Sequence, residues 1–210
     1  MIRYIYAADL PRHAELAADM FRDRTVQFRD RMGWEVQVDP LGWETDSYDG
    51  MDPLYVVAED ARGAHAGSMR FLPTTGPHML ADVFPHLVEG GPLRSGRIWE
   101  CTRFCLAPDA APGVARELLL GASELGLGFG LTHALGVFDA KMTRVYRRLG
   151  WEPELLSRPR DGIAAGLWTF DAELHDALCA ATGITARISR GWFEDAFGDL
   201  PLPVGLSSGA

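Results

Sequence analysis

Lysine is nearly absent from this sequence of 210 residues, and basic residues as a class are outnumbered. Lys and Arg together number 20 against 29 Asp and Glu, which leaves a net charge of -9. Because phosphate contacts require a basic surface, this balance argues against a general nucleic-acid binder. Every basic residue except Lys141 is an arginine. Arginine forks suit planar carboxylates and phosphates, although a GC-rich genome produces the same bias.

Cysteine is scarce, and long apolar runs are missing. Cys101, Cys105 and Cys179 are an odd number without CxxC spacing, so neither a disulfide framework nor a zinc site is expected. No stretch approaches the roughly 18 apolar residues of a membrane span, and the first residues lack the apolar segment of a secretion signal. We therefore expect a cytoplasmic protein that makes no use of a membrane.

Common catalytic and cofactor motifs are absent as well. The six histidines show no HxH or HExxH spacing, so no metal site is predicted. No GxSxG nucleophile motif occurs. The glycines of residues 126–130 resemble a dinucleotide loop, but they follow an expected helix and precede an expected strand, which is the reverse of the order such a loop requires.

What is present is the composition of one globular domain, with 47% hydrophobic and 23% charged residues. We expect a single domain over residues 1–205 and a loose tail over 206–210. Hydrophobic periodicity and turn residues predict its elements. The expected strands are 2–7, 54–59, 66–72, 97–106, 131–138 and 166–170, and the expected helices cover 11–32, 77–84, 113–125 and 140–149, with further helical pieces after 170. This order predicts an α/β fold with a mixed sheet and crossover helices.

Six charged residues stand in apolar or turn-rich surroundings. They are Arg24, Asp46, Asp49, Arg70, Glu100 and Arg103. Three acids and three arginines could form one neutral network. The alternative is that these six residues are ordinary surface charges, because a sequence does not show whether positions this far apart lie close together in the fold.

The sequence segments around these charges resemble those of the acyl-homoserine lactone synthases of the LuxI type, the bacterial autoinducer synthases. The resemblance covers residues 20 to 151. It rests on Arg24 with Phe28 and Trp34, then on the segments ETDSYD at 44–49, GSMRFLPTTGPHML at 67–80 with Phe84 after it, and WECTRF at 99–104.

The resemblance implies the fold of GCN5-related N-acetyltransferases, a twisted mixed sheet flanked by helices with a V-shaped cleft between two central strands. It also implies the reaction. An acyl group passes from a thioester to the amine of S-adenosylmethionine, whose carboxylate then displaces 5'-methylthioadenosine and closes the lactone used in quorum sensing. No cofactor is expected, because S-adenosylmethionine and the acyl thioester are substrates.

The resemblance also assigns roles to the charged and aromatic residues. An α-amino group has a pKa near 8, so a modest base suffices, and Glu100 or Asp46 is expected to serve. The zwitterionic, sulfonium-bearing substrate needs acids, arginines and aromatic faces together. Its expected binding residues are Arg24, Phe28, Trp34, Asp46, Asp49, Arg70, Phe84 and Arg103.

The strand around Glu100 permits a local check. Strict alternation places Glu100 and Arg103 on opposite faces, where they could not share a site. A β-bulge near Cys101 or Thr102, which the related acetyltransferases have, would bring them to one face. It would also free a backbone N–H for a tetrahedral oxyanion.

The thioester donor, acyl carrier protein or acyl-CoA, must be anionic. Lys141, Arg144, Arg147 and Arg148 form a basic stripe on the expected helix 140–149 that could steer a carrier protein, although a solvated helix face explains it almost as well. The acetyltransferase pyrophosphate loop is missing after Leu106, which weakens the acyl-CoA alternative without excluding it.

By the same resemblance the acyl chain lies between the strand 131–138 and the helix after it. Its expected lining is Cys101, Gly136, Phe138, Met142, Val145 and Tyr146. Gly136 stands where the family can place a hydroxyl that binds a 3-oxo group, so an acyl chain unsubstituted at C3 is expected. Two alternatives remain for the whole protein: an N-acetyltransferase that uses acyl-CoA, and a non-catalytic sensor of acyl ligands.

Overall fold

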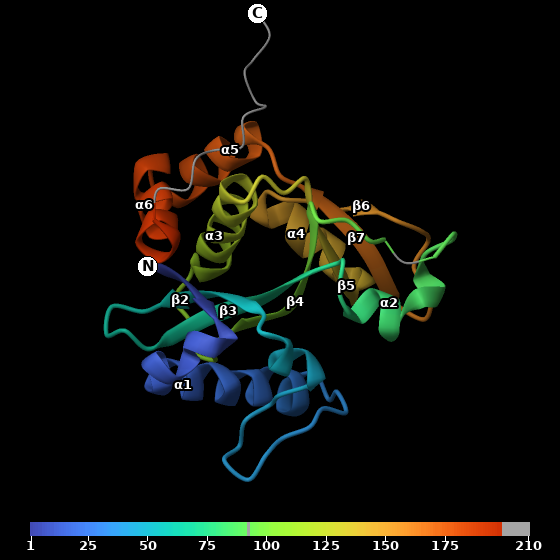
Figure 1. Ribbon diagram of the computed structural model, residues 1–210, viewed down its shortest axis with the longest axis horizontal. Helices are drawn as coiled ribbons and strands as arrows, with labels where there is room; N and C mark the ends of the chain where they lie inside the picture. The colour runs from blue at the N-terminus through green and yellow to red at the C-terminus, as the bar shows by residue number, and fades with distance from the viewer. Residues whose placement is uncertain (92, 199–210) are drawn as a thin grey trace, which may run out of the picture.

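One mixed sheet of seven strands, in the order β1-β2-β3-β4-β5-β7-β6, forms the centre of the protein (Figure 1). The computed structural model describes residues 1–91 and 93–198, so the expected tail lies outside the described residues. All neighbouring strands are antiparallel except β4 and β5. The strands are β1 (Ile2–Tyr6), β2 (Leu54–Glu59), β3 (His65–Pro73), β4 (Ile98–Leu106), β5 (His133–Asp139), β6 (Glu154–Leu155) and β7 (Ile163–Thr169).

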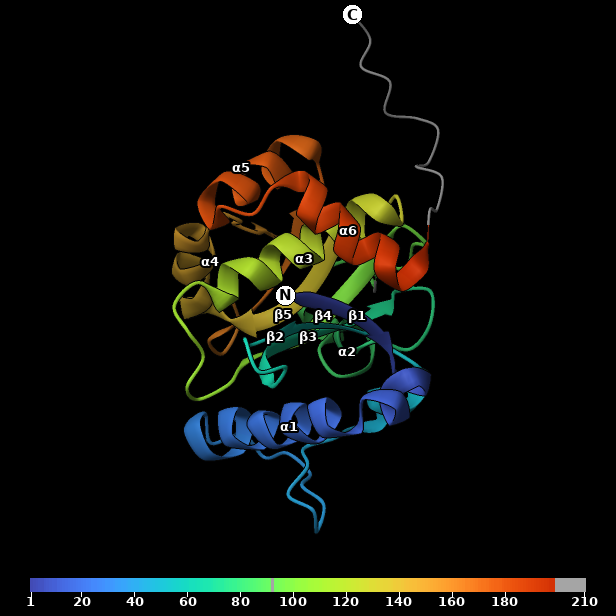
Figure 2. The ribbon, with the colours of Figure 1, turned by 90° about the vertical axis from the view of Figure 1, so that its left-hand side faces the viewer.

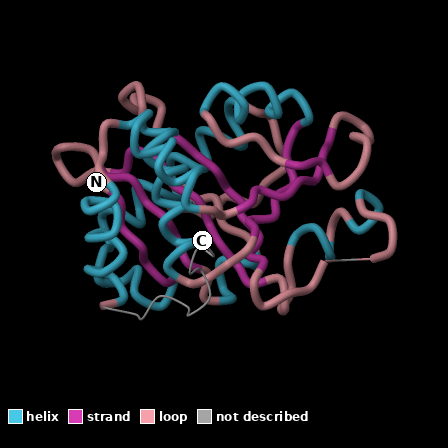
Figure 3. Tube along the Cα trace, turned by 90° about the horizontal axis from the view of Figure 1, so that it is seen from above, coloured by secondary structure: helices cyan, strands magenta, loops and turns pink. Residues whose placement is uncertain are grey.

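Helices cover both faces of this sheet (Figure 2). One face of the sheet carries α3, with α5 and α6 packed on it, and α4 contributes to the same core. The opposite face carries α1 over the N-terminal strands and α2 over β5 and β7 (Figures 1 and 2). Seen from above, the N-terminal strands run beneath a layer of helices (Figure 3). The α-helices are α1 (Ala14–Arg24), α2 (Met79–Asp82), α3 (Val114–Gly128), α4 (Thr143–Leu149), α5 (Ala172–Thr182) and α6 (Ala186–Phe197).

The expected α/β order is correct, with differences at individual elements. The first predicted helix is three consecutive pieces: a 3-10 turn over Ala7–His13, then α1, then a π-helix over Thr25–Arg31. The predicted helix 77–84 shrinks to the single turn of α2, and the short edge strand β6 was not expected. Gly150 ends α4 with a φ of 101°, a left-handed conformation that favours glycine.

The central strands β4 and β5 separate after a short parallel contact. Their pairing joins only residues 98–100 to 133–135, after which the described register ends. Beyond that point the two strands diverge around a cavity, so a V-shaped cleft opens between them. A divergence of this kind leaves strand backbone and side chains free to face a ligand.

A β-bulge interrupts β4 beside this cleft. The pairing of β3 with β4 passes from Ser68–Cys105 to Arg70–Thr102, so the one residue between these pairs on β3, Met69, faces two on β4, Arg103 and Phe104. Arg103 takes a φ of 53° there. The bulge was expected near Cys101 or Thr102 and in fact lies one residue farther along, because the left-handed turn occurs at Arg103.

The glycines rejected as a dinucleotide loop have a packing role instead. A Cβ on Gly126 would lie 2.2 Å from the ring of Phe170, and one on Gly128 would lie 2.4 Å from Phe193. Both glycines belong to the end of α3, against which α5 and α6 pack. Within the described residues, no helix is long and apolar enough to cross a membrane.

Candidate active site

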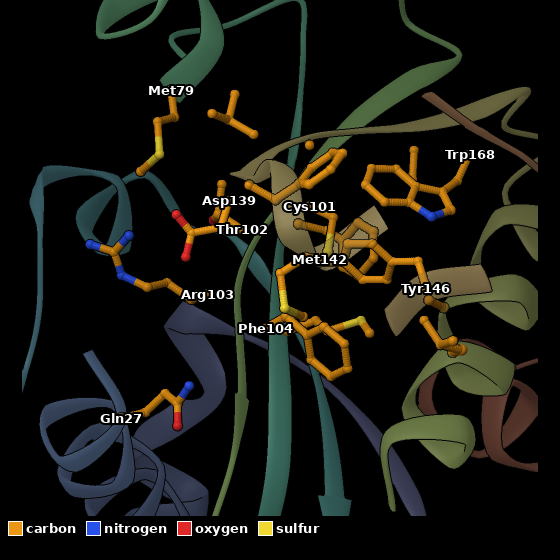
Figure 4. A pocket seen from close by; sticks show the side chains of 18 of the residues that line it. Gln27, Met79, Cys101, Thr102, Arg103, Phe104, Asp139, Met142, Tyr146 and Trp168 are labelled. Carbon is orange, nitrogen blue, oxygen red and sulfur yellow. The ribbon is translucent and has the colours of Figure 1, made fainter. Parts of the chain in front are cut away.

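The cleft between β4 and β5 holds a cavity of about 160 Å³, whose lining side chains are shown in Figure 4. Its walls are mainly apolar and come from the π-helix, β3, β4, β5, α3, α4 and β7. One end carries Gln27, Met79 and Arg103, and the other carries Tyr146 and Trp168 (Figure 4). The cavity therefore has a polar end and an aromatic end.

Behind the polar end, three arginines and three carboxylates form a closed ring of alternating charge. Each acid bridges two arginines, and each arginine bridges two acids. The N–O distances around the ring are Arg24–Glu44 2.7 Å, Glu44–Arg103 2.9 Å, Arg103–Asp46 2.7 Å, Asp46–Arg70 2.6 Å, Arg70–Asp49 2.8 Å and Asp49–Arg24 2.9 Å. The ring is neutral, but its third acid is Glu44 and not the expected Glu100.

Local structure explains why these side chains converge. Arg24 ends α1 and points to the loop that carries the acids. Asp46 and Asp49 form a capping box at a 3-10 turn, so both carboxylates are fixed by backbone N–H groups as well as by arginines. Arg70 belongs to β3, and the bulge turns Arg103 toward the same face of the sheet.

The arginines of the ring favour the ionised form of Asp46 and Asp49. Burial alone raises the pKa of Asp49, but the hydrogen bond from Arg24 and the charges of Arg24 and Arg70 outweigh it and bring the pKa well below 3.8. The pKa of Asp46 is lowered in the same way, with Arg70 and Arg103 opposing burial. An acid with a lowered pKa is a weak base, so Asp46 is poorly suited to accept a proton.

Sequence reasoning missed one member of the ring and assigned another wrongly. Glu44, which is fully buried, occupies the place in the network expected for Glu100. The sequence could have indicated Glu44 as a member of the network, because it belongs to the same turn-rich segment as Asp46 and Asp49. Nothing in the sequence states which acid pairs with which arginine, because that depends on how loop and sheet meet.

Glu100 lies apart from the ring and holds the start of α2. Its two carboxylate oxygens each accept a backbone N–H at 2.7 Å, one from Met79 and one from Leu80. Burial raises its pKa above 4.5, although these two N–H groups and the neighbouring His78 act against the rise. Glu100 does not line the cavity among the described residues, whereas Met79 and Cys101 beside it do. It is therefore a buried carboxylate of raised basicity next to the cavity wall.

Two of the three predicted aromatic residues lie at the polar end. The rings of Phe28 and Trp34 stack at 5.2 Å with 12° between their planes, and the guanidinium of Arg103 lies 5.3 Å from the Phe28 ring. Trp34 is 40% exposed, so its outer face is open to a ligand. Phe84 is not brought to the cavity; it packs instead with Leu80 and Leu87 on the face covered by α2.

Most of the predicted acyl-pocket residues line the cavity. Cys101, Gly136, Phe138, Met142 and Tyr146 do so. Val145 does not, because it precedes Tyr146 on α4 and is turned outward, with 38% of its surface exposed. The lining that sequence reasoning missed comes from other elements, mainly Met69, Phe71, Leu119, Ala122, Trp151 and Trp168.

The predicted basic stripe lies on the surface of α4 and the turn before it. Lys141 pairs with Asp139, and Arg147 forms a two-pronged pair with Glu152. Arg144 and Arg148 are exposed, and within the described part of the chain neither side chain has an ion-pair partner. These two arginines, one helical turn apart, are the part of the stripe available to a partner.

The ring acids face arginines and not one another. Accordingly, no group of three or more His, Cys, Asp or Glu side chains suited to a metal ion occurs in residues 1–91 and 93–198.

Comparison with known proteins gives a consistent match. Residues 8–166 match the autoinducer synthase family. An acyl-homoserine-lactone synthase of Rhizobium etli is 44% identical over 165 residues, which cover 74% of this chain and 77% of the relative.

Solved structures of similar proteins agree with the sequence match. The CoA-dependent acyl-homoserine lactone synthase MesI has a TM-score of 0.78 at 30% identity and covers 90% of this chain and 98% of its own. The synthase BjaI, solved with S-adenosylmethionine and isopentyl-CoA, has a TM-score of 0.80 at 26% identity, over 89% of this chain and 90% of its own. A putative N-acetyltransferase from Lactobacillus plantarum, at 18% identity and a TM-score of 0.51 over 80% of this chain and 95% of its own, shares the fold. The expected acetyltransferase-like fold is confirmed.

Proposed function

Because this chain belongs to the autoinducer synthase family, we propose that the polar end of the cavity between β4 and β5 binds S-adenosylmethionine and that the aromatic end binds the acyl chain. The protein is an acyl-homoserine-lactone synthase, an acyltransferase of quorum sensing, and not an acetyltransferase of another kind or a sensor. S-adenosylmethionine and an acyl thioester are its substrates. The observation that carries the proposal is the closed charge ring at the polar end of an otherwise apolar cleft.

The reaction requires two bond exchanges. The amine nitrogen of S-adenosylmethionine forms an amide bond to the acyl carbon, the thiolate leaves, and the amine proton passes to a base. A carboxylate oxygen of the same molecule then attacks its Cγ, and the C–S bond breaks with its electron pair on sulfur. The sulfonium thereby becomes the neutral thioether 5'-methylthioadenosine, and the lactone is closed.

The polar end of the cavity suits S-adenosylmethionine. Arg103 lines this end and, although paired with Glu44 and Asp46, presents an edge to the cavity. The stacked Phe28 and Trp34 provide a flat face for the adenine ring or the sulfonium charge. Arg24, Asp49 and Arg70 sit behind them as the rigid part of the ring. The ring fixes the position of Arg103 and Asp46 at this end before the substrate arrives.

Glu100 is the better of the two carboxylates for the role of base. Its pKa is raised by burial, whereas the arginines lower the pKa of Asp46. Each Glu100 oxygen keeps a second lone pair after accepting one N–H bond. Although Glu100 lies behind the cavity wall, a water placed between it and the cavity, beside Met79 and Cys101, would donate to it and relay the proton. The bulge at Arg103 supplies the complementary group, a strand backbone N–H without a β3 partner residue in the described register, for the tetrahedral oxyanion.

The donor is proposed to be an acyl carrier protein. The unpaired Arg144 and Arg148 favour an acidic macromolecule, and the loop after β4 lacks a glycine-rich pyrophosphate site. MesI and BjaI are described as CoA-dependent, which describes those proteins and keeps acyl-CoA as the alternative donor here. A cytoplasmic location and a single domain over 1–205 stay predictions.

The proposed function is tested by release of methylthioadenosine. Purified protein is incubated with S-adenosylmethionine and hexanoyl groups loaded either on acyl carrier protein or on CoA. We expect methylthioadenosine and free thiol in equal amounts, with the carrier-protein thioester giving the higher kcat/KM. Thiol release without methylthioadenosine would instead indicate a plain acyltransferase.

The role of Glu100 is tested separately with Glu100→Gln. We expect thiol release to fall about 100-fold or more, the usual contribution of a positioned base. The amide offers only one acceptor oxygen, so one N–H of Met79 or Leu80 loses its partner and stability falls by about 1–3 kcal/mol. A melting curve separates the two effects: a folded variant that keeps most of its turnover would assign the base to another group.

A further inference from the structure

The aromatic end of the cavity is a closed wall of three interlocked rings. Trp168 of β7 packs edge-to-face against Phe138 of β5 at 5.2 Å and against Tyr146 of α4 at 5.0 Å, and Phe138 lies 5.4 Å from Tyr146. Each is at most 8% exposed, and each lines the cavity. Trp168 and Tyr146 lie at the end away from Arg103 and Gln27 (Figure 4). They therefore meet whatever extends farthest from the reacting amine.

Trp168 is held in this position from two sides. Its indole N–H donates to the backbone oxygen of Trp151 at 3.1 Å. Its six-membered ring also lies over Gly136 of the paired strand, where an added Cβ would be 3.0 Å from Cζ3. An indole fixed by a hydrogen bond and by close contact does not swing aside without losing both interactions.

The space in front of this wall is small. The whole cavity measures about 160 Å³ and includes the polar end that S-adenosylmethionine is proposed to use. The total volume does not set the chain length, because S-adenosylmethionine must share it; the position of the ring wall does. A chain that runs from the polar end toward Trp168 does not extend past these rings without moving them.

We propose, as an extension of the proposed function, that Trp168 is the specificity-determining residue that ends the acyl site. It restricts the enzyme to compact acyl groups, short or branched, and disfavours long linear ones. The flexible side chains beside it, Met69 and Met142, adapt the width of the site but do not lengthen it.

The test compares hexanoyl and dodecanoyl groups loaded on the same carrier, with kcat/KM measured by methylthioadenosine release. For the natural chain we expect dodecanoyl to be at least about 10-fold poorer. Trp168→Leu removes the wall and should raise the dodecanoyl to hexanoyl ratio by about 10-fold. Leu167→Ala is the matched control, since it removes apolar volume from the same strand outside the cavity lining and should leave the ratio unchanged.

Gly136→Ala provides the opposite change. Its Cβ meets the Trp168 ring and narrows the site, so preference should move from hexanoyl toward butanoyl. If Trp168→Leu fails to fold, Trp168→Phe keeps a ring and should give a smaller shift in the same direction. Equal kcat/KM for both chains in the natural protein, or a ratio unchanged in the Trp168 and Gly136 variants, would overturn this inference. Absence of methylthioadenosine with every thioester would instead overturn the proposed function, and the inference with it.

Discussion

At the scale of single residues, the backbone conformation of Arg103 determines the direction in which its side chain leaves the strand β4. With regular alternation, the residue after Thr102 would face the acyl cavity. The φ of 53° at Arg103 directs its side chain into the charge ring at the polar end of the cavity, where it meets Glu44 and Asp46, while Cys101 and Phe104 line the apolar part. A non-glycine residue in this region costs of order 1 kcal/mol, which the ion pairs to Glu44 and Asp46 offset.

Gly136 carries a prediction at the scale of single residues. It lines the cavity but offers no side-chain donor, so a 3-oxo group would be buried without a side-chain partner at a cost of about 1–3 kcal/mol. We expect unsubstituted hexanoyl thioester to outcompete 3-oxohexanoyl thioester in a mixed assay, with products separated by mass spectrometry. A product pool dominated by the 3-oxo lactone would show that backbone or water supplies the missing donor.

At the scale of elements, α4 separates two functions along one short helix. Tyr146 faces the acyl cavity, whereas Arg144, Arg147 and Arg148 face solvent. The same seven residues can therefore meet the acyl chain on one side and the protein that delivers it on the other.

Reversal of charge on that outer face tests the carrier-protein contact. Arg144→Glu with Arg148→Glu should raise KM for an acyl carrier protein more than it lowers kcat, because steering acts on encounter and not on chemistry. The natural protein should lose this advantage as salt rises past about 0.15 M, where the Debye length is about 8 Å. Arg12→Glu with Arg62→Glu, two exposed arginines elsewhere, is the matched control. Identical kinetics for both double variants at all salt concentrations would assign the stripe to ordinary solvated surface.

At the scale of the whole molecule, the charge ring joins α1, the loop before β2, and the strands β3 and β4. It connects segments from residue 24 to residue 103 through side chains that are largely withdrawn from water. A buried charge that loses its partner is costly, so the ring holds these elements in one arrangement.

The ring predicts a specific dependence of stability on acid. The folded pKa values of Asp46 and Asp49 are lowered, so their stabilisation is fully present above the unfolded value of 3.8 and is lost as the pH falls through the folded values. Glu100, with a raised pKa, acts in the opposite sense: its contribution is present below 4.5 and is lost as the pH rises through its folded value. Melting temperatures measured from neutral pH downward should therefore show the losses due to the ring only below about pH 4.

A variant of the ring checks that assignment. Asp49→Asn leaves Arg24 and Arg70 short of one charge partner and should destabilise the protein at neutral pH by about 3–5 kcal/mol. Its melting temperature should also depend less on acid. Asp9→Asn, which breaks an exposed pair with Arg12, should cost less than about 1 kcal/mol. Equal acid profiles for Asp49→Asn and the natural chain would contradict a stabilising ring.

The sequence by itself determined the family, the reaction and the order of elements. Hydrophobic periodicity is local, so strands such as 54–59 and helices such as 140–149 could be recognised from neighbouring residues, and the segment 67–80 carries the family signature. The need for a bulge in β4 was also apparent, because Glu100 and Arg103 have the wrong spacing for one face.

Only the tertiary structure decided which charges meet. An ion pair depends on the distance between atoms that belong to separate elements, and no local pattern encodes that distance. For this reason Glu44, and not Glu100, closes the ring, and Glu100 instead holds the first N–H groups of α2. The position of Trp168 in the acyl cavity could not be predicted for the same reason. It reaches the cavity only because β7 pairs with β5 and Gly136 leaves room for its ring.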